Sequence, residues 1–237
     1  MRLVTGLVLV FALFHSVAAA LGSGRGEWGL LVAAVVVAAA VIYERFVLAP
    51  KVSPVVSAFG RATARGMGAA AAVSVALILV PAVAAGFAGW TLRLDDRIVV
   101  TAIGLFAQAG IAEETLFRSY LFGHLREGRS FWRAAWLSIA PFAAVHLFLF
   151  WTMPWPIAAA ALALSCVISF PLAWLYELGG RTVWAPAVLH AVIQGLIKVV
   201  VVSGPGSEGL PLIWMAACAV LPLVLLLVPL CPVIHRD

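Results

Sequence analysis

The chain has 237 residues, of which 65% are apolar and 11% are charged, against about 45–50% and about 25% in an ordinary soluble domain. Its mean hydropathy is +1.13, so it has more apolar side chains than one core can bury, which excludes a soluble globular fold. The net charge of +5 does not indicate nucleic-acid binding, because the Lys and Arg residues lie in short segments between apolar runs and form no stripe.

About 20 apolar residues are needed to cross a bilayer as a helix, and eight stretches of the chain meet this requirement. In chain order they cover residues 3–21, 28–49, 66–90, 98–122, 133–151, 155–177, 182–202 and 210–232. Short segments rich in Gly, Pro and charge separate them, and they leave no room for a soluble domain. We therefore expect an all-α fold, a polytopic membrane helical bundle of about eight transmembrane helices.

The first stretch allows two interpretations. Arg2, the apolar run after it and the small residues 18–20 before Gly22 are also typical of a secretory signal peptide. A multispanning protein does not need one, so we favour a retained first helix. With the amino terminus inside, most Lys and Arg residues between the spans lie on the cytoplasmic side. The positive-inside rule therefore predicts an integral protein of the cell membrane with both termini in the cytoplasm.

The fourth stretch carries the densest cluster of ionisable residues, Glu113, Glu114 and Arg118. Such groups are costly inside a membrane and are candidates for function. Glu114 and Arg118 are four residues apart on one helical face and should pair. Glu113 points about 140° away from Arg118 and stays available for a reaction. The alternative is a purely structural ion pair, which a second carboxylate beside the first makes expensive.

Two other stretches carry polar residues at helical spacing. Phe142 and His146 lie one turn apart in the fifth stretch, and His190 and Gln194 lie one turn apart in the seventh. Alone, each histidine fits a simple hydrogen bond between helices. By rise per residue, both histidines and Glu113 can share one pocket in the cytoplasmic half of the membrane. A carboxylate, two imidazoles and an amide there can activate water and stabilise an oxyanion.

Other hydrolytic motifs are missing from the sequence. It contains no HExxH and no GxSxG, and its three aspartates, Asp95, Asp96 and Asp237, lie in loops or at the terminus, which excludes an intramembrane aspartyl pair. Ser165 and Ser169 lie in a span, but neither has a histidine at motif spacing. A glutamate that acts with a histidine is therefore the remaining type of hydrolytic site.

In their order and spacing, the three motifs resemble those of the CPBP family of intramembrane proteases, relatives of the type II CAAX prenyl proteases that are also called Abi proteins. They are Glu113-Glu114-x-x-x-Arg118, Phe142-x-x-x-His146 and His190-x-x-x-Gln194. The resemblance covers about residues 98–200. It divides the chain into amino-terminal transmembrane helices (1–97), CPBP-like catalytic core helices (98–202) and a carboxyl-terminal transmembrane helix with its tail (203–237).

The resemblance implies an intramembrane endopeptidase that hydrolyses a peptide bond of a hydrophobic or lipidated substrate with a glutamate-activated water. Glu113 is then the general base, His146 helps to hold and polarise the water, and His190 with Gln194 faces the oxyanion. Glu114, Arg118 and Phe142 support the geometry of the site. The partners that we expect are a peptide or protein substrate and the lipid bilayer, with no nucleic acid.

Two questions stay open at this point. One glutamate and two histidines are also a zinc-binding set, but we favour glutamate chemistry with neither a metal nor another cofactor. The family's third motif usually ends in Asn, and Gln194 keeps the amide while adding a methylene and a rotatable bond. A non-catalytic membrane scaffold or bacteriocin-immunity protein on the same fold is therefore the alternative function, followed by a transporter or proton relay.

Overall fold

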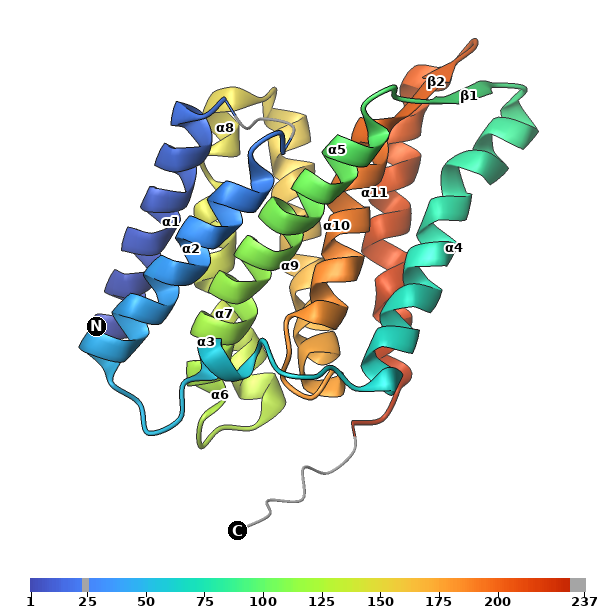
Figure 1. Cartoon of the computed structure of the whole chain (residues 1–237). Helices are drawn as coiled ribbons and strands as arrows, with labels where there is room; N and C mark the ends of the chain where they lie inside the picture. Colours follow the sequence, from blue (N-terminus) through green and yellow to red (C-terminus); the bar gives the residue numbers. More distant parts are fainter. Residues whose placement is uncertain (23–25, 231–237) are drawn as a thin grey trace.

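The computed structural model describes residues 1–22 and 26–230 (Figure 1). Within these residues, seven helices are long and apolar enough to cross a membrane, which confirms the polytopic helical bundle. They are Arg2–Ala20, Gly29–Leu48, Ala64–Ala88, Ile98–Arg126, Phe131–Thr152, Trp155–Leu178 and Ser207–Leu227. The remaining predicted span is the shorter apolar helix Trp184–Val199. The end of the predicted stretch 210–232 and the carboxyl terminus lie outside the described residues.

Several spans are built from more than one helical element. In chain order, the helices are α1 (Arg2–Ala20), α2 (Gly29–Tyr43), η1 (Glu44–Leu48), α3 (Pro54–Ser57), α4 (Ala64–Ala88), α5 (Ile98–Leu105), η2 (Phe106–Ala112), η3 (Thr115–Phe122), α6 (Gly123–Arg126), α7 (Phe131–His146), α8 (Leu149–Thr152), α9 (Trp155–Leu178), α10 (Trp184–Val199), η4 (Ser207–Gly209), α11 (Leu210–Val220) and η5 (Leu221–Leu227). Of these, η1, η2 and η3 are π-helical, whereas η4 and η5 are 3₁₀ helices.

Hydroxyl side chains cap the amino-terminal ends of several of these helices. Ser53 accepts a hydrogen bond from the Val56 amide at the start of α3, and Thr63 accepts one from the Gly66 amide at the start of α4. Such caps satisfy amide groups that have no partner within the helix. At its other end, α4 stops at Gly89, which adopts the left-handed conformation that favours glycine. Helix α4 therefore begins and ends within two residues of the predicted stretch 66–90.

A two-stranded antiparallel sheet lies at one end of the bundle, next to α4 and α10 (Figure 1). It pairs β1 (Thr91–Leu94) with β2 (Val200–Ser203), in a register that sets Thr91 opposite Ser203. The predicted span 182–202 therefore ends as a helix at Val199. Residues 199–202 are four consecutive valines, whose branched side chains favour a strand. Hydropathy alone does not separate a short apolar strand from a helix.

Two of the three apolar clusters among the described residues pack the bundle around its central helices. One joins α1 and α2 to η3 and includes Leu7, Val36 and Phe117. The other joins α4, α9, α10 and α11 and includes Leu77 and Leu189. Because α10 also packs against α5 and η2, the fourth and seventh predicted spans lie side by side at the centre. The amino terminus, α3 and α6 lie at the end of the bundle opposite the β1–β2 sheet (Figure 1).

Helix α1 is tied closely to the helix that carries the two glutamates. The Tyr120 hydroxyl donates a hydrogen bond to the Leu3 carbonyl at 3.1 Å, and the Tyr43 hydroxyl donates one to the Arg2 carbonyl at 3.0 Å. Both rings approach α1 where Gly6 has no side chain, and a Cβ atom there would overlap the Tyr120 hydroxyl and the Tyr43 ring. The packing of α1 therefore depends on a glycine at this position.

Candidate active site

Glu113 and Glu114 lie between two π-helical segments, η2 and η3. A π-turn closes its hydrogen bond one residue later than an α-turn and is frequent at functional sites. The small residues before the glutamates also let α10 approach. A Cβ atom at Gly110 would lie 2.8 Å from the Ala187 carbonyl oxygen. This close contact brings the polar residues of α10 next to both carboxylates.

Glu114 forms a fully buried pair with Arg118, as the four-residue spacing predicted. The Arg118 Nε atom donates to one carboxylate oxygen at 3.1 Å, and both side chains have an exposed fraction of 0%. The other carboxylate oxygen lies 2.6 Å from Nδ1 of the equally buried His190. Because a carboxylate only accepts hydrogen bonds, Nδ1 of His190 carries the hydrogen. The contact with His190 was not predicted.

The Arg118 guanidinium has two further neighbours. Its Nη1 atom donates to the Ser169 hydroxyl on α9 at 3.0 Å. Its Cζ atom lies 5.0 Å from the centre of the Phe142 ring on α7, where a cation is attracted to the aromatic face. Its Nη2 atom is buried and has no hydrogen-bond partner among the described residues. Phe142 thus contacts the polar network as predicted, whereas Ser169 is an addition from a fourth helix.

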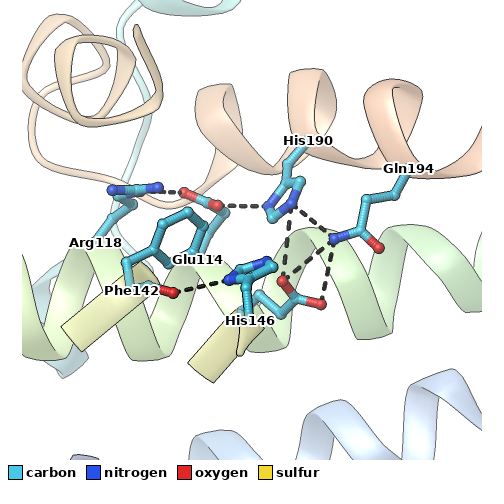
Figure 2. Close-up of polar contacts among 7 residues, drawn as sticks. Glu114, Arg118, Phe142, His146, His190 and Gln194 are labelled. Atoms are coloured by element: carbon cyan, nitrogen blue, oxygen red, sulfur yellow. Dashed lines mark hydrogen bonds and ion pairs between the residues drawn. The ribbon is translucent and has the colours of Figure 1, made fainter. Parts of the chain in front are cut away.

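Gln194 joins His190 to Glu113 (Figure 2). Its amide nitrogen lies 2.9 Å from Nε2 of His190 and 3.3 Å from the nearer Glu113 oxygen. With its hydrogen on Nδ1, a neutral His190 ring accepts at Nε2, so the two amide hydrogens of Gln194 serve His190 and Glu113. Unlike Glu114, the Glu113 side chain is 15% exposed. The structure therefore brings together three of the four predicted catalytic residues, Glu113, His190 and Gln194, through direct contacts.

His146, the fourth, ends helix α7 and points into the same region (Figure 2). Its Nδ1 atom lies 2.8 Å from the Phe142 carbonyl oxygen. Because a carbonyl only accepts, Nδ1 carries the hydrogen and Nε2 carries a lone pair. The ring is half-buried and lies close enough to His190 and Arg118 to interact with both electrostatically. His146 can therefore accept a hydrogen bond from a water molecule at the site.

Two more ionisable residues, Lys198 and His15, lie near the site although neither is among the predicted site residues. Lys198 follows Gln194 by one turn of α10 and interacts electrostatically with Glu113. His15 interacts electrostatically with His146 from α1, and its ring lies 5.2 Å from that of Phe148. The spacing of four residues could have indicated Lys198. No spacing could have indicated His15 or Ser169, because their contacts arise from the packing of separate helices.

The site residues do not fit a zinc ion in this arrangement. Among the described residues, no three His, Cys, Asp or Glu side chains are placed to hold a metal ion. The His190 ring shows why, since its Nδ1 atom faces Glu114 and its Nε2 atom faces Gln194. A metal needs a free nitrogen lone pair from each imidazole. His190 would have to give up Gln194 to provide one.

An apolar groove of about 260 Å³ lies between α4, α5 and α10. Its lining includes Leu105 on α5, and Ala191 and Gly195 on α10. Ala191 and Gly195 directly follow His190 and Gln194 in sequence, so the groove runs along the neighbouring face of α10. An apolar chain can therefore lie beside the polar site.

Comparison with known proteins supports the resemblance drawn from the three motifs. Residues 95–196 match the family model described as type II CAAX prenyl endopeptidase Rce1-like. The matched region contains every residue predicted for the site. No curated protein and no solved structure matches the chain. The molecule is thus a polytopic membrane protein that carries, at residues 95–196, the sequence pattern of the CAAX-type protease family, and the predicted resemblance is confirmed there.

Proposed function

We propose that this protein is an intramembrane endopeptidase that hydrolyses a peptide bond of a hydrophobic or lipidated substrate with a water activated by Glu113. The contrast between two adjacent carboxylates carries this proposal. Glu114 is fully buried and neutralised by Arg118, whereas Glu113 is 15% exposed and is held by the Gln194 amide. Two carboxylates in such different environments suit a structural role and a general-base role, respectively.

Glu113 acts on a water molecule that His146 orients. As the water oxygen attacks the peptide carbonyl carbon, Glu113 takes one of its protons and Nε2 of His146 accepts a hydrogen bond from the other hydrogen. The C–N bond then breaks, and the carboxyl group of Glu113 returns its proton to the leaving amine. Glu113 and His146 can carry out every proton transfer in these reaction steps. We therefore propose a reaction without a metal or other cofactor.

Gln194 provides a donor for the oxyanion in this proposal. In the resting site, one of its amide hydrogens faces Glu113. Once Glu113 is protonated, it holds that hydrogen less strongly, and the amide can turn to the oxyanion that has formed on the substrate. His190 keeps the amide in place through Nε2. The donor thus becomes available when negative charge develops on the substrate, as transition-state stabilisation requires.

The surroundings of the site favour an apolar substrate. The groove beside α10 suits the hydrophobic part of a peptide or an attached lipid chain. We propose that the end of the bundle with the amino terminus, α3 and α6 faces the cytoplasm of a cell membrane, because its exposed cations include Arg61, Arg65, Arg129 and Arg133. The peptide and the bilayer are then the partners, and nucleic acid is not.

One observation favours the alternative of a non-catalytic scaffold or bacteriocin-immunity protein. The longer side chain of Gln194 spans the distance between His190 and Glu113. Its amide therefore binds the carboxylate of the proposed base, and the same amide hydrogen is not available to an oxyanion. If this bridge is permanent, the fold is kept for binding a partner and not for hydrolysis.

Cleavage of a panel of hydrophobic and C-terminally prenylated reporter peptides by the purified protein in detergent tests the proposal. Glu113→Gln and His146→Ala should abolish cleavage, whereas Glu127→Gln, a change at an exposed glutamate, should not. A zinc chelator should have no effect. Cleavage that survives Glu113→Gln contradicts the role of Glu113, and cleavage lost with the chelator contradicts the metal-free mechanism. If neither wild type nor Gln194→Asn cleaves any peptide while both fold, the scaffold is favoured.

A further inference from the structure

We propose that Ser169 is a positioning residue for the reaction at Glu113: by holding Arg118, it keeps one oxygen of Glu114 for His190. This inference rests on the proposed protease function for its kinetic consequence. Its structural basis does not depend on that function. Ser169 is 2% exposed, and its hydroxyl accepts from Nη1 of Arg118 at 3.0 Å.

Arg118 makes fewer hydrogen bonds to the Glu114 carboxylate than an arginine in an ion pair usually makes. Arginine prefers a two-pronged pair in which both carboxylate oxygens are bound. Here Nε alone reaches Glu114, and Nη2 has no hydrogen-bond partner among the described residues. The second oxygen of Glu114 is free to accept from Nδ1 of His190 at 2.6 Å. Ser169 holds Nη1 and thereby fixes the guanidinium in this one-pronged orientation.

Loss of the Ser169 hydroxyl would release the guanidinium. Nη1 would lose its acceptor, and the group could turn until a second nitrogen reached Glu114. That nitrogen would compete with His190 for the same oxygen. His190 would then no longer be held with its hydrogen on Nδ1, and Nε2 would no longer be fixed as the acceptor for Gln194. The chain of contacts from Ser169 to Glu113 would be broken although Arg118 remained paired.

Helix α9 offers a matched control one turn earlier. Ser165 is 3% exposed, on the same helix and four residues from Ser169. Its hydroxyl donates to the Leu162 carbonyl of its own helix at 2.8 Å. Within the described part of the chain, Arg118 is hydrogen-bonded to Glu114 and Ser169 and not to Ser165. Ser165→Ala and Ser169→Ala therefore remove the same buried group from the same helix, and they differ in the contact with Arg118.

The kinetic test compares the two variants on a cleaved reporter peptide. Ser169→Ala should lower kcat by about tenfold or more, because misplacement of catalytic groups by about an ångström costs up to about a hundredfold. KM should match that of Ser165→Ala, and Ser169→Thr, which restores the hydroxyl, should recover kcat. The proposal is overturned if the two alanine variants have the same kcat, or if Ser169→Thr is as slow as Ser169→Ala.

A second measurement separates this proposal from the proposed function. In the ¹⁵N-labelled protein, the Nδ1 proton of His190 should resonate at low field because of its short bond to Glu114. Ser169→Ala should shift that resonance and Ser165→Ala should not. An unshifted resonance overturns the positioning role, whether or not any peptide is cleaved. If the wild type cleaves nothing but the shift is seen, the protease proposal fails and the positioning of His190 by Ser169 stands.

Discussion

Replacing Glu114 with Gln should destabilise the protein strongly, because it leaves the charge of Arg118 buried without a counter-ion. Both side chains have an exposed fraction of 0%, so neither water nor lipid headgroups can take over the role of the carboxylate. Removing one partner of a buried pair costs about 3–5 kcal/mol. At about 2–4 °C per kcal/mol for a chain of this size, the unfolding temperature should fall by roughly 6–20 °C.

The change in stability is measured by thermal unfolding in detergent, with Glu127→Gln as the control for an exposed glutamate. A second arm removes both charges in the double variant Glu114→Leu, Arg118→Met. This variant should be more stable than Glu114→Gln, because no unpaired charge remains. It should still be inactive, because His190 has lost its acceptor. The reasoning is refuted if Glu114→Gln unfolds at the wild-type temperature, or if the double variant is no more stable than Glu114→Gln.

Two further outcomes test the packing of α1 and the role of the amide. Gly6→Val should lower the free energy of unfolding by about 1–3 kcal/mol, because the larger side chain would overlap Tyr120. Gly68→Ala is the control and should have no such effect, because its Cβ meets open space. Equal unfolding temperatures of the two variants would contradict the close packing of α1 at Gly6. Gln194→Leu should lower kcat by about a hundredfold or more, the usual cost of a lost oxyanion donor. Gln194→Asn keeps the amide on a shorter side chain and should keep or raise kcat. Equal rates for these two would show that the amide of Gln194 has no part in catalysis.

The sequence was sufficient for the spans and for one contact of the site. Apolar length located the helices because a bilayer imposes a minimum length, and the short helix Trp184–Val199 was still found through its hydropathy. The pair of Glu114 and Arg118 could be predicted because both residues lie on one helix, where spacing fixes their relative direction. Contacts within one element are thus predictable when the element is identified correctly.

For residues on different helices, the sequence could predict only that they lie in the same region of the bundle, and not which atoms are in contact. The depth of each residue in its span indicated that His190, Gln194 and Glu113 could meet, but not that the amide would bridge the other two. Nothing in the sequence placed Ser169 beside Arg118, because that contact depends on which face of α9 is turned towards Arg118. The strand after Val199 was missed for a different reason, since a run of valines is equally apolar in a helix and in a strand.

The β1–β2 sheet ties together the two helices that carry Glu113 and His190. It joins the segment before α5 to the segment after α10, and the Asp95 amide adds a hydrogen bond to the Val199 carbonyl at 2.8 Å. The Trp90 indole donates another to the Pro205 carbonyl at 2.8 Å. The two helices that carry Glu113 and His190 are therefore clamped together at this end.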